Sequence, residues 1–330
     1  MTFTLAHRTA DQSTRLTHYR RALAVCQYVQ GKVFDSADSL SVPLQPIEIP
    51  RLQRAIFTSG TIYFTLGPTN VERALHEYAR SLELVIRPPP PQSDAEQYTL
   101  RDLLVAACVA GHAMSSNGTG LPDCFDMLGS RQNDPSFDLL GKVRETGDQL
   151  LHALLLAGGG ILPTPLLAPD QVTRLSVSLF GQSDGFLPSI CTRNSQGELK
   201  KPADSVREQA NGMTSTILLT LAKRFQDGAL SSAPVPGSAG GLRVSTSVVI
   251  LLYYIALAWS PAPSTYNNLG IVLSGVSETR QGSDGEVLDG VSFARMFYTE
   301  GLRLDPKHPH LLTNLGSLLK DQGQIDEAIK

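Results

Sequence analysis

The amino-acid sequence predicts an all-α fold in which helix pairs stack into an α-α superhelix with long loop insertions. Leucine and alanine dominate its apolar residues, and aromatic residues make up only 6%, a balance that favours helix over sheet. A short pattern centred on Leu-Gly occurs twice near the C-terminal end, at residues 266–273 and 312–319. Clusters of proline and glycine separate the helical segments. The 330 residues suffice for roughly seven to nine helix pairs.

Residues 13–30 are predicted to form the first helix. Leu16, Leu23 and Cys26 fall near one face of this helix. We expect Gly31 to end it, because glycine often follows the last residue of a helix. A connector with three prolines then leads to residue 50.

A degenerate helix pair is expected between residues 51 and 91. Gly60 occupies the position of the glycine in the Leu-Gly pattern, and Gly67-Pro68 provides a turn. After the turn, apolar residues recur at helical steps of three and four, with Ala74 and Tyr78 among them. Four consecutive prolines end the pair, since proline cannot continue a helix.

The middle of the chain, residues 92–243, reads as divergent helix pairs with surface insertions. Helices are predicted at 98–114, 138–157 and 205–226, and residues 172–180 fit either a strand or a short helix. The segments 115–120, 158–169 and 229–241 are rich in glycine, serine and proline, which is typical of loops. Stacked helix pairs tolerate such insertions because each pair packs only on its neighbours.

The last part of the chain, residues 244–330, carries the clearest repeat. Gly270 precedes Ala294 by 24 positions, whereas Gly316 precedes Ala328 by 12. The difference indicates a twelve-residue insertion near 278–289, where Gln-Gly-Ser-Asp-Gly is typical of a loop. Without the insertion, the 46 positions between the two glycines become 34, which is about the period of the tetratricopeptide repeat.

The repeat residues have structural roles in this interpretation. Glycine and alanine allow the two helices of a unit to approach closely, leucine fills the seam beside them, and proline ends the second helix. Tyr298 and Leu302 are expected to pack against the following unit. Replacing Gly316 by leucine is expected to cost about 2 kcal/mol through overpacking. The structural residues predicted on this basis are Leu269, Gly270, Ala294, Tyr298, Pro306, Leu315, Gly316 and Ala328.

The segment from residue 260 to 330 resembles a particular family more closely than a generic tetratricopeptide repeat. Its Asn-Leu-Gly motifs at 268–270 and 314–316, with Leu-Asp-Pro-Lys-His-Pro-His at 304–310, are similar to the repeats of fungal proteins related to O-linked N-acetylglucosamine transferases. The resemblance implies a repeat superhelix that precedes a two-lobed glycosyltransferase domain. That domain would transfer N-acetylglucosamine from its UDP donor to serine or threonine of nuclear and cytosolic proteins.

The resemblance also implies a binding role for two asparagines. In this family, an asparagine directly before each Leu-Gly lines the inner face of the superhelix and holds the backbone of a bound polypeptide. The matching positions are Asn268 and Asn314, whereas the degenerate pair has Thr58 there. A carboxamide offers two donors and an acceptor, which suits a peptide unit of any sequence. The alternative is that these asparagines are solvated or cap a helix.

Several classes of function are disfavoured by the sequence. A net charge of −3 lacks the basic excess of a nucleic-acid-binding protein. The apolar runs at 150–162 and 248–259 are shorter than the roughly 20 residues that a membrane-spanning helix needs. The four cysteines form no Cys-x-x-Cys motif, and no catalytic residue, metal site or cofactor site is predicted. Scattered cysteines without a secretory signal fit the nucleus or cytoplasm.

The leading hypothesis is therefore a protein-binding scaffold that recruits protein substrates or extended peptides for an attached transferase. The second repeat stops at Lys330, before its second helix is complete, so we expect an N-terminal fragment of the parent enzyme. Residues 1–91, 92–243 and 244–330 are its predicted parts. A stand-alone adaptor or co-chaperone without enzymatic activity is the alternative, although residues 266–273 lack the basic side chains of a clamp for acidic tails. A third hypothesis is that the chain forms a homodimer.

Overall fold

The computed structural model is all-α apart from two short hairpins, as predicted. It describes residues 12–40, 44–86, 100–115, 165–227, 246–277, 279–281 and 287–328, and these form two compact units. Unit 1 comprises the described residues up to Leu100 and residues 186–217. Unit 2 comprises the described residues in 101–185, 218–227 and 246–328. The predicted three-part division of the chain stays a prediction.

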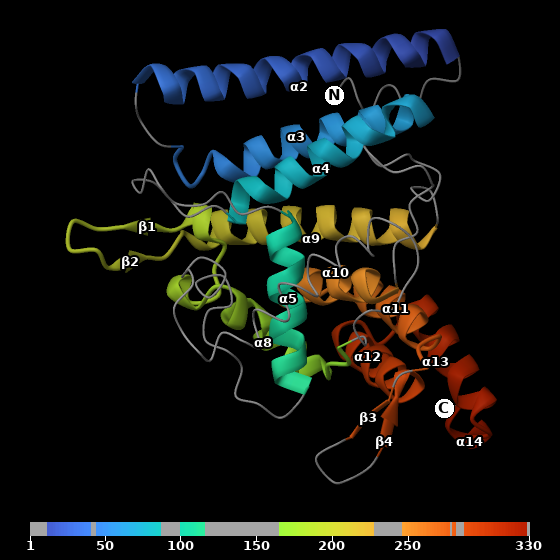
Figure 1. Ribbon diagram of the computed structural model, residues 1–330. Coiled ribbons are helices and arrows are strands. Elements are labelled where there is room, and N and C mark those ends of the chain that lie inside the picture. The colour runs from blue at the N-terminus through green and yellow to red at the C-terminus, as the bar shows by residue number, and fades with distance from the viewer. Residues whose placement is uncertain are drawn as a thin grey trace. The chain divides into compact units, whose positions relative to one another are not determined.

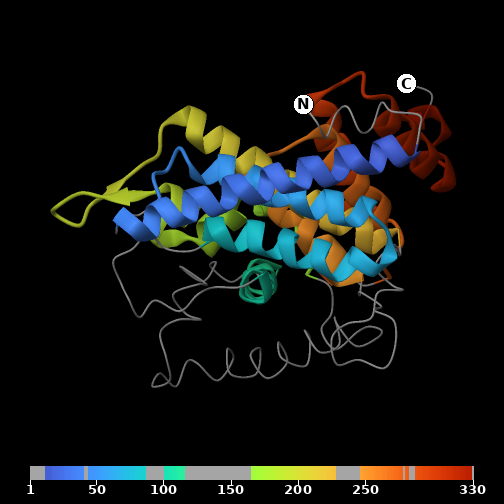
Figure 2. The same ribbon diagram turned by 90° about the horizontal axis from the view of Figure 1, so that it is seen from above.

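Unit 1 is built around three helices that are consecutive in the sequence. These are α2 (Gln12–Leu40), α3 (Ile49–Thr65) and α4 (Val71–Ile86), with the 3-10 turn η1 (Pro68–Asn70) before α4. Helices α3 and α4 lie side by side in both views (Figures 1 and 2), and α2 packs on α3. The remainder comprises η4 (Pro188–Ile190), the hairpin of β1 (Thr192–Arg193) and β2 (Leu199–Lys200), and the first half of α9 (Asp204–Gln226).

The first helix is longer than the sequence predicted. We expected Gly31 to end it, but α2 continues to Leu40. A single glycine inside a helix costs only about 1 kcal/mol relative to alanine, which neighbouring residues can offset. The degenerate pair is confirmed as helices, because α3 and α4 flank the Gly67-Pro68 turn. In α4, Ala74, Tyr78 and Leu82 are all buried, as expected for one face of a helix.

Unit 2 begins with helices from the divergent middle of the chain. They are α5 (Leu100–Ser115), α8 (Pro169–Leu179), the 3-10 turn η3 (Gly181–Ser183) and the second half of α9. The segment that fitted either a strand or a helix is thus a helix. The predicted helix at 138–157, the predicted loop at 229–241 and most of the predicted loops at 115–120 and 158–169 lie outside the described residues. Of the last two, Ser115 is the end of α5, and residues 165–168 lie outside any helix or strand.

The repeat region of unit 2 is a series of helices, each packed on the next. It runs through α10 (Thr246–Trp259), α11 (Pro263–Leu273), α12 (Gly290–Leu304), α13 (Pro309–Asp321) and α14 (Ile325–Ala328). Buried rings join three of them, with Phe297 lying 5.9 Å from Tyr254 and 6.0 Å from Tyr266 between ring centroids. None of the helices in the described ranges is long and apolar enough to cross a membrane.

Helix boundaries in this region follow the prolines. Pro263 and Pro309 lie in the first turns of α11 and α13, where proline's missing N–H costs little. His308 caps α13, since its Nδ1 accepts a hydrogen bond from the Leu311 backbone N–H at 3.3 Å. Asp289 caps α12 by accepting from the Ser292 hydroxyl at 2.7 Å and from the Ser292 N–H at 2.8 Å, and these bonds lower the pKa of its carboxyl.

The predicted insertion is more ordered than a loop at both of its ends. Strands β3 (Thr279–Gln281) and β4 (Val287–Asp289) pair antiparallel between α11 and α12. Arg280 on β3 donates to the Leu166 carbonyl at 3.0 Å and to Gln171 Oε1 at 2.7 Å. These bonds fasten β3 to Leu166, just before α8, and to Gln171 in its first turn, all within unit 2.

Candidate functional site

The candidate site rests on the close packing of α11 against α12. A Cβ atom added at Gly270 would lie 2.7 Å from both Cδ1 and Cζ of Tyr298, which is too close for any side chain. Ala294 on the same face of α12 is fully buried, and Leu269 fills the seam beside it, also fully buried. The absence of a side chain at Gly270 therefore lets α12 approach α11 through the Tyr298 ring.

Tyr298 is placed differently from our expectation. We expected it to pack against the following unit, but its ring covers Gly270 of its own unit. Contact with the following helix is made at Gly301, where an added Cβ would lie 2.7 Å from Leu311 Cδ1 and 2.9 Å from Tyr266 Cβ. The sequence interpretation missed Gly301, although its place three residues after Tyr298 on a helix would have put it near the same face.

The same contact occurs in unit 1, in the pair of α3 and α4. An added Cβ at Gly60 would lie 2.8 Å from Tyr78 Cε1 and 3.1 Å from the Ala74 carbonyl oxygen. Ala74 and Tyr78 are buried, as Ala294 and Tyr298 are in unit 2. The degenerate pair is thus packed in the same way as the clear repeat, with a tyrosine over a glycine.

The second Leu-Gly motif is packed more loosely in the described residues. An added Cβ at Gly316 would meet only the Ala328 carbonyl oxygen, at an ordinary 3.7 Å. Leu315 and Ala328 are half-buried, and Pro306 is exposed just after α12. The overpacking that we expected for leucine at Gly316 is therefore not supported. Among the described residues, α14 offers only Ile325–Ala328 to pack against α13.

Three asparagine side chains form a chain of hydrogen bonds between α11 and α13. Asn314 Nδ2 donates to Asn267 Oδ1 at 2.8 Å, and Asn267 Nδ2 donates to Asn268 Oδ1 at 3.4 Å. Asn267 is buried, with 7% of its surface exposed, whereas Asn268 and Asn314 are half-buried. The structure therefore brings together the two asparagines singled out from the sequence and joins them through a third. Asn267 was missed, although it directly precedes Asn268.

The outer ends of this chain are available to a ligand. In the part of the chain that the structure describes, Asn268 Nδ2 and Asn314 Oδ1 have no hydrogen-bond partner. One is a donor and the other an acceptor, which are the two groups that a peptide unit needs. Asn267 orients the Asn314 amide through the bond of 2.8 Å and contacts the Asn268 amide through the longer bond of 3.4 Å.

The buried tyrosines near the asparagines are uncharged, and the ion pair between α12 and α14 is exposed. Burial raises the pKa of Tyr298 to about 12 and also raises that of Tyr266, so both phenols stay neutral. Arg295 pairs with Glu327 at 2.8 Å and bonds Gln324 at 2.9 Å, joining α12 to the residues around α14. This pair is exposed and contributes at most about 1 kcal/mol.

Metal and thiol chemistry find no support in the described residues. Across the described ranges, no three His, Cys, Asp or Glu residues gather as metal ligands would. Burial raises the pKa of Cys108 to about 12 and that of Cys191 to about 11, so neither is a reactive thiolate at neutral pH. Burial also raises the pKa of Cys26.

Comparison with known proteins supports the presence of a tetratricopeptide repeat but does not support a particular family of repeat proteins. A tetratricopeptide-repeat family model matches residues 297–330, about a tenth of the chain. The match covers the second half of α12 and all of α13 and α14, where the sequence had predicted the repeat. No curated protein matches the chain. The chain therefore carries a tetratricopeptide repeat, a type of helix pair that generally mediates protein–protein interactions.

Proposed function

We propose that this chain is a protein-binding scaffold that holds extended segments of protein substrates for an O-linked N-acetylglucosamine transferase. The single observation that carries the proposal is the chain of amides at Asn314, Asn267 and Asn268, which leaves one donor and one acceptor for a peptide unit. These two amide groups would bind the backbone of a polypeptide and not its side chains, which suits an enzyme that modifies many different proteins.

The transferase part of the proposal rests on the resemblance of residues 260–330 to that family. On this proposal the chain itself supplies no catalytic residue, and UDP-N-acetylglucosamine would bind elsewhere in the parent enzyme. The protein would act in the nucleus and cytoplasm, where the family's substrates occur. A stand-alone adaptor or co-chaperone is the second candidate, and the following experiment separates the two.

The test measures how fast the gene product that carries these residues modifies two acceptors, one long and one short. Asn268→Ala combined with Asn314→Ala is expected to lower kcat/KM for an unfolded protein acceptor by about tenfold, because one or two hydrogen bonds of 0.5–1.5 kcal/mol are lost. For an acceptor peptide too short to reach the repeats, kcat/KM should be unchanged. Transfer is followed with labelled UDP-N-acetylglucosamine.

Two results would count against this account in different ways. Equal loss of kcat/KM with both acceptors would show that the asparagines act on folding or on catalysis, not on recruitment. In the second result, the gene product transfers no N-acetylglucosamine and still binds extended polypeptide through these asparagines. That result would exclude the transferase and support the stand-alone adaptor. Reading the coding sequence past Lys330 for two nucleotide-binding βα lobes supplies an independent check.

A further inference from the structure

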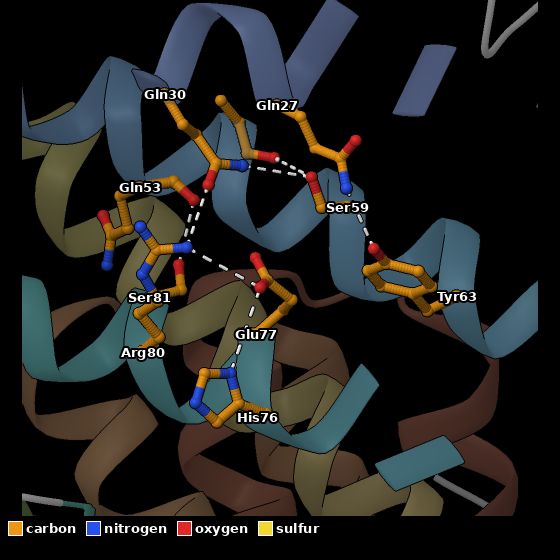
Figure 3. A network of polar contacts seen from close by, with 10 residues as sticks. Gln27, Gln30, Gln53, Ser59, Tyr63, His76, Glu77, Arg80 and Ser81 are labelled. Atoms are coloured by element: carbon orange, nitrogen blue, oxygen red, sulfur yellow. Dashed lines mark hydrogen bonds and ion pairs between the residues drawn. The ribbon is translucent and has the colours of Figure 1, made fainter. Parts of the chain in front are cut away.

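Unit 1 contains a polar pocket that the proposed function does not use. It has a volume of about 250 Å³ and lies among α2, α3 and α4 (Figure 3). Apart from one glycine, every residue that lines it is polar: Gln27, Gln30, Ser59, Tyr63, Glu77 and Arg80. Gln30 and Ser59 are buried, with 5% and 1% of their surface exposed, whereas Gln27 is exposed, so the pocket leads from solvent to polar groups between the helices.

The walls of the pocket are held in place without any ligand. Gln30 is fixed from two sides, because its Nε2 donates to Ser59 Oγ at 3.1 Å and its Oε1 accepts from Arg80 at 3.0 Å. Gln27 donates to the Tyr63 hydroxyl at 2.9 Å. Arg80 also lies 3.6 Å from Glu77 Oε1. Three helices thus contribute to one network, as Figure 3 shows, and the site is preorganised.

Three groups at this network remain without partners among the described residues. Glu77 Oε2 is enclosed and accepts no hydrogen bond, which is unfavourable for a buried polar atom. Gln27 Oε1 has no donor, and the Tyr63 hydroxyl accepts a hydrogen bond but donates none. The pocket therefore offers two acceptors and one donor.

We propose that this pocket binds a primary carboxamide, as found on glutamine or asparagine. The two N–H groups of a carboxamide would donate to Glu77 and Gln27, and its carbonyl oxygen would accept from the Tyr63 hydroxyl. Because Arg80 balances Glu77, the lining carries no net charge and favours a neutral polar group over a carboxylate or an ammonium. A volume of about 250 Å³ lies below the 300–1,000 Å³ of drug-sized pockets, which suits one side chain or one free amino acid.

This inference is independent of the proposed transferase function, because all residues that it uses belong to unit 1. The carboxamide could come from a free amino acid or from a bound polypeptide. Three probes separate these sources: free glutamine, glutamine blocked as N-acetyl-N-methylamide, and methionine blocked in the same way. Methionine matches the length of glutamine but lacks the amide.

Titration of the full chain with each probe, followed by NMR, gives the dissociation constants. We expect blocked glutamine or free glutamine to bind at least tenfold more tightly than blocked methionine. Tighter binding of the blocked form assigns the pocket to a polypeptide side chain, and tighter binding of the free form assigns it to the amino acid. Equal binding of glutamine and methionine probes, or saturable binding of none, would show a pocket filled only by water and overturn the proposal.

Two variants with one control locate the binding. Glu77→Gln keeps the shape but replaces an acceptor by a donor, and it should weaken carboxamide binding by at least tenfold. Tyr63→Phe should also weaken carboxamide binding by at least tenfold, because it removes the hydroxyl donor. If Glu77→Gln fails to fold, Tyr63→Phe alone tests the proposal. Glu72→Gln is the control, since Glu72 lies on the same helix but is exposed. Unchanged binding in both pocket variants would contradict the assignment.

Discussion

Replacing Gly290 by alanine is expected to destabilise unit 2 by about 3 kcal/mol, the largest effect among the single-methyl changes considered. An added Cβ would press on the Leu273 carbonyl oxygen and lie 2.5 Å from the Val276 carbonyl oxygen and 2.9 Å from Val276 Cβ. Two of these atoms belong to the backbone at the end of α11, so no side-chain rotation can relieve the overlap. The start of α12 would have to move away from α11.

The measurement is urea unfolding followed by the fluorescence of Trp259. This is the only tryptophan of the chain, and it is buried in unit 2, where its Nε1 donates to the Gly185 carbonyl at 3.1 Å. Gly275→Ala is the matched control in the same connection, since its Cβ would have only an ordinary contact at 3.7 Å. A free energy of unfolding as little changed by Gly290→Ala as by the control would refute the contact between α11 and α12.

Replacing Gly270 by leucine is expected to cost about 3 kcal/mol by overpacking. Its Cβ alone would overlap the Tyr298 ring, and that ring is buried between the two helices. Gly316→Leu, by contrast, should change the free energy of unfolding by no more than about 0.5 kcal/mol, because an added Cβ would make only one ordinary contact among the described residues, at 3.7 Å from the Ala328 carbonyl oxygen. The two substitutions are identical in chemistry and lie in equivalent motifs, so they form a matched pair.

A double-mutant cycle identifies the cause of the expected loss. If the leucine side chain clashes with the Tyr298 ring, Tyr298→Ala should cost less in the Gly270→Leu background than in the wild type. Unfolding midpoints and slopes are measured for all four proteins. Strict additivity, or equal losses for Gly270→Leu and Gly316→Leu, would mean that the glycine does not set the distance between helices.

Local sequence signals predicted most of the helices and the close approach of α11 and α12 at Gly270, but few of the other contacts between helices. The period of 34 became visible once the insertion was removed. The structure places Pro263 and Pro309 in the first turns of α11 and α13. Gly31 misled because a helix end depends on how well the neighbouring residues sustain the helix, not on glycine alone.

Contacts between helices were harder to predict because they depend on tertiary packing. Nothing local distinguishes Gly290, which must be small because of two carbonyl groups about fifteen positions earlier in the chain. Asn267 is similar, since its role appears only when α13 brings Asn314 within 2.8 Å. The polar pocket of unit 1 joins side chains from three helices, so spacing along any one of them could not reveal it.

The roles of the three asparagines can be separated by how they are held. Asn267 is buried and bonded at both ends of its amide, so Asn267→Ala should lower both the melting temperature and peptide affinity. Asn268 contributes only one long bond of 3.4 Å to the protein, so its removal should barely affect stability. Thr313→Ala is the control on α13, because its hydroxyl bonds the Pro309 carbonyl of its own helix.

The most direct test of the central claim is the affinity of Asn268→Ala for an extended, serine- and threonine-containing peptide. We predict that binding, measured by fluorescence anisotropy, weakens by about threefold, since one hydrogen bond is lost, while the melting temperature stays within error of the wild type. N-methylation of the peptide backbone should weaken binding to the wild type in the same way, because it removes the N–H donors. Unchanged affinity of Asn268→Ala, or a melting temperature that falls along with affinity, would contradict a peptide-binding role for the asparagines.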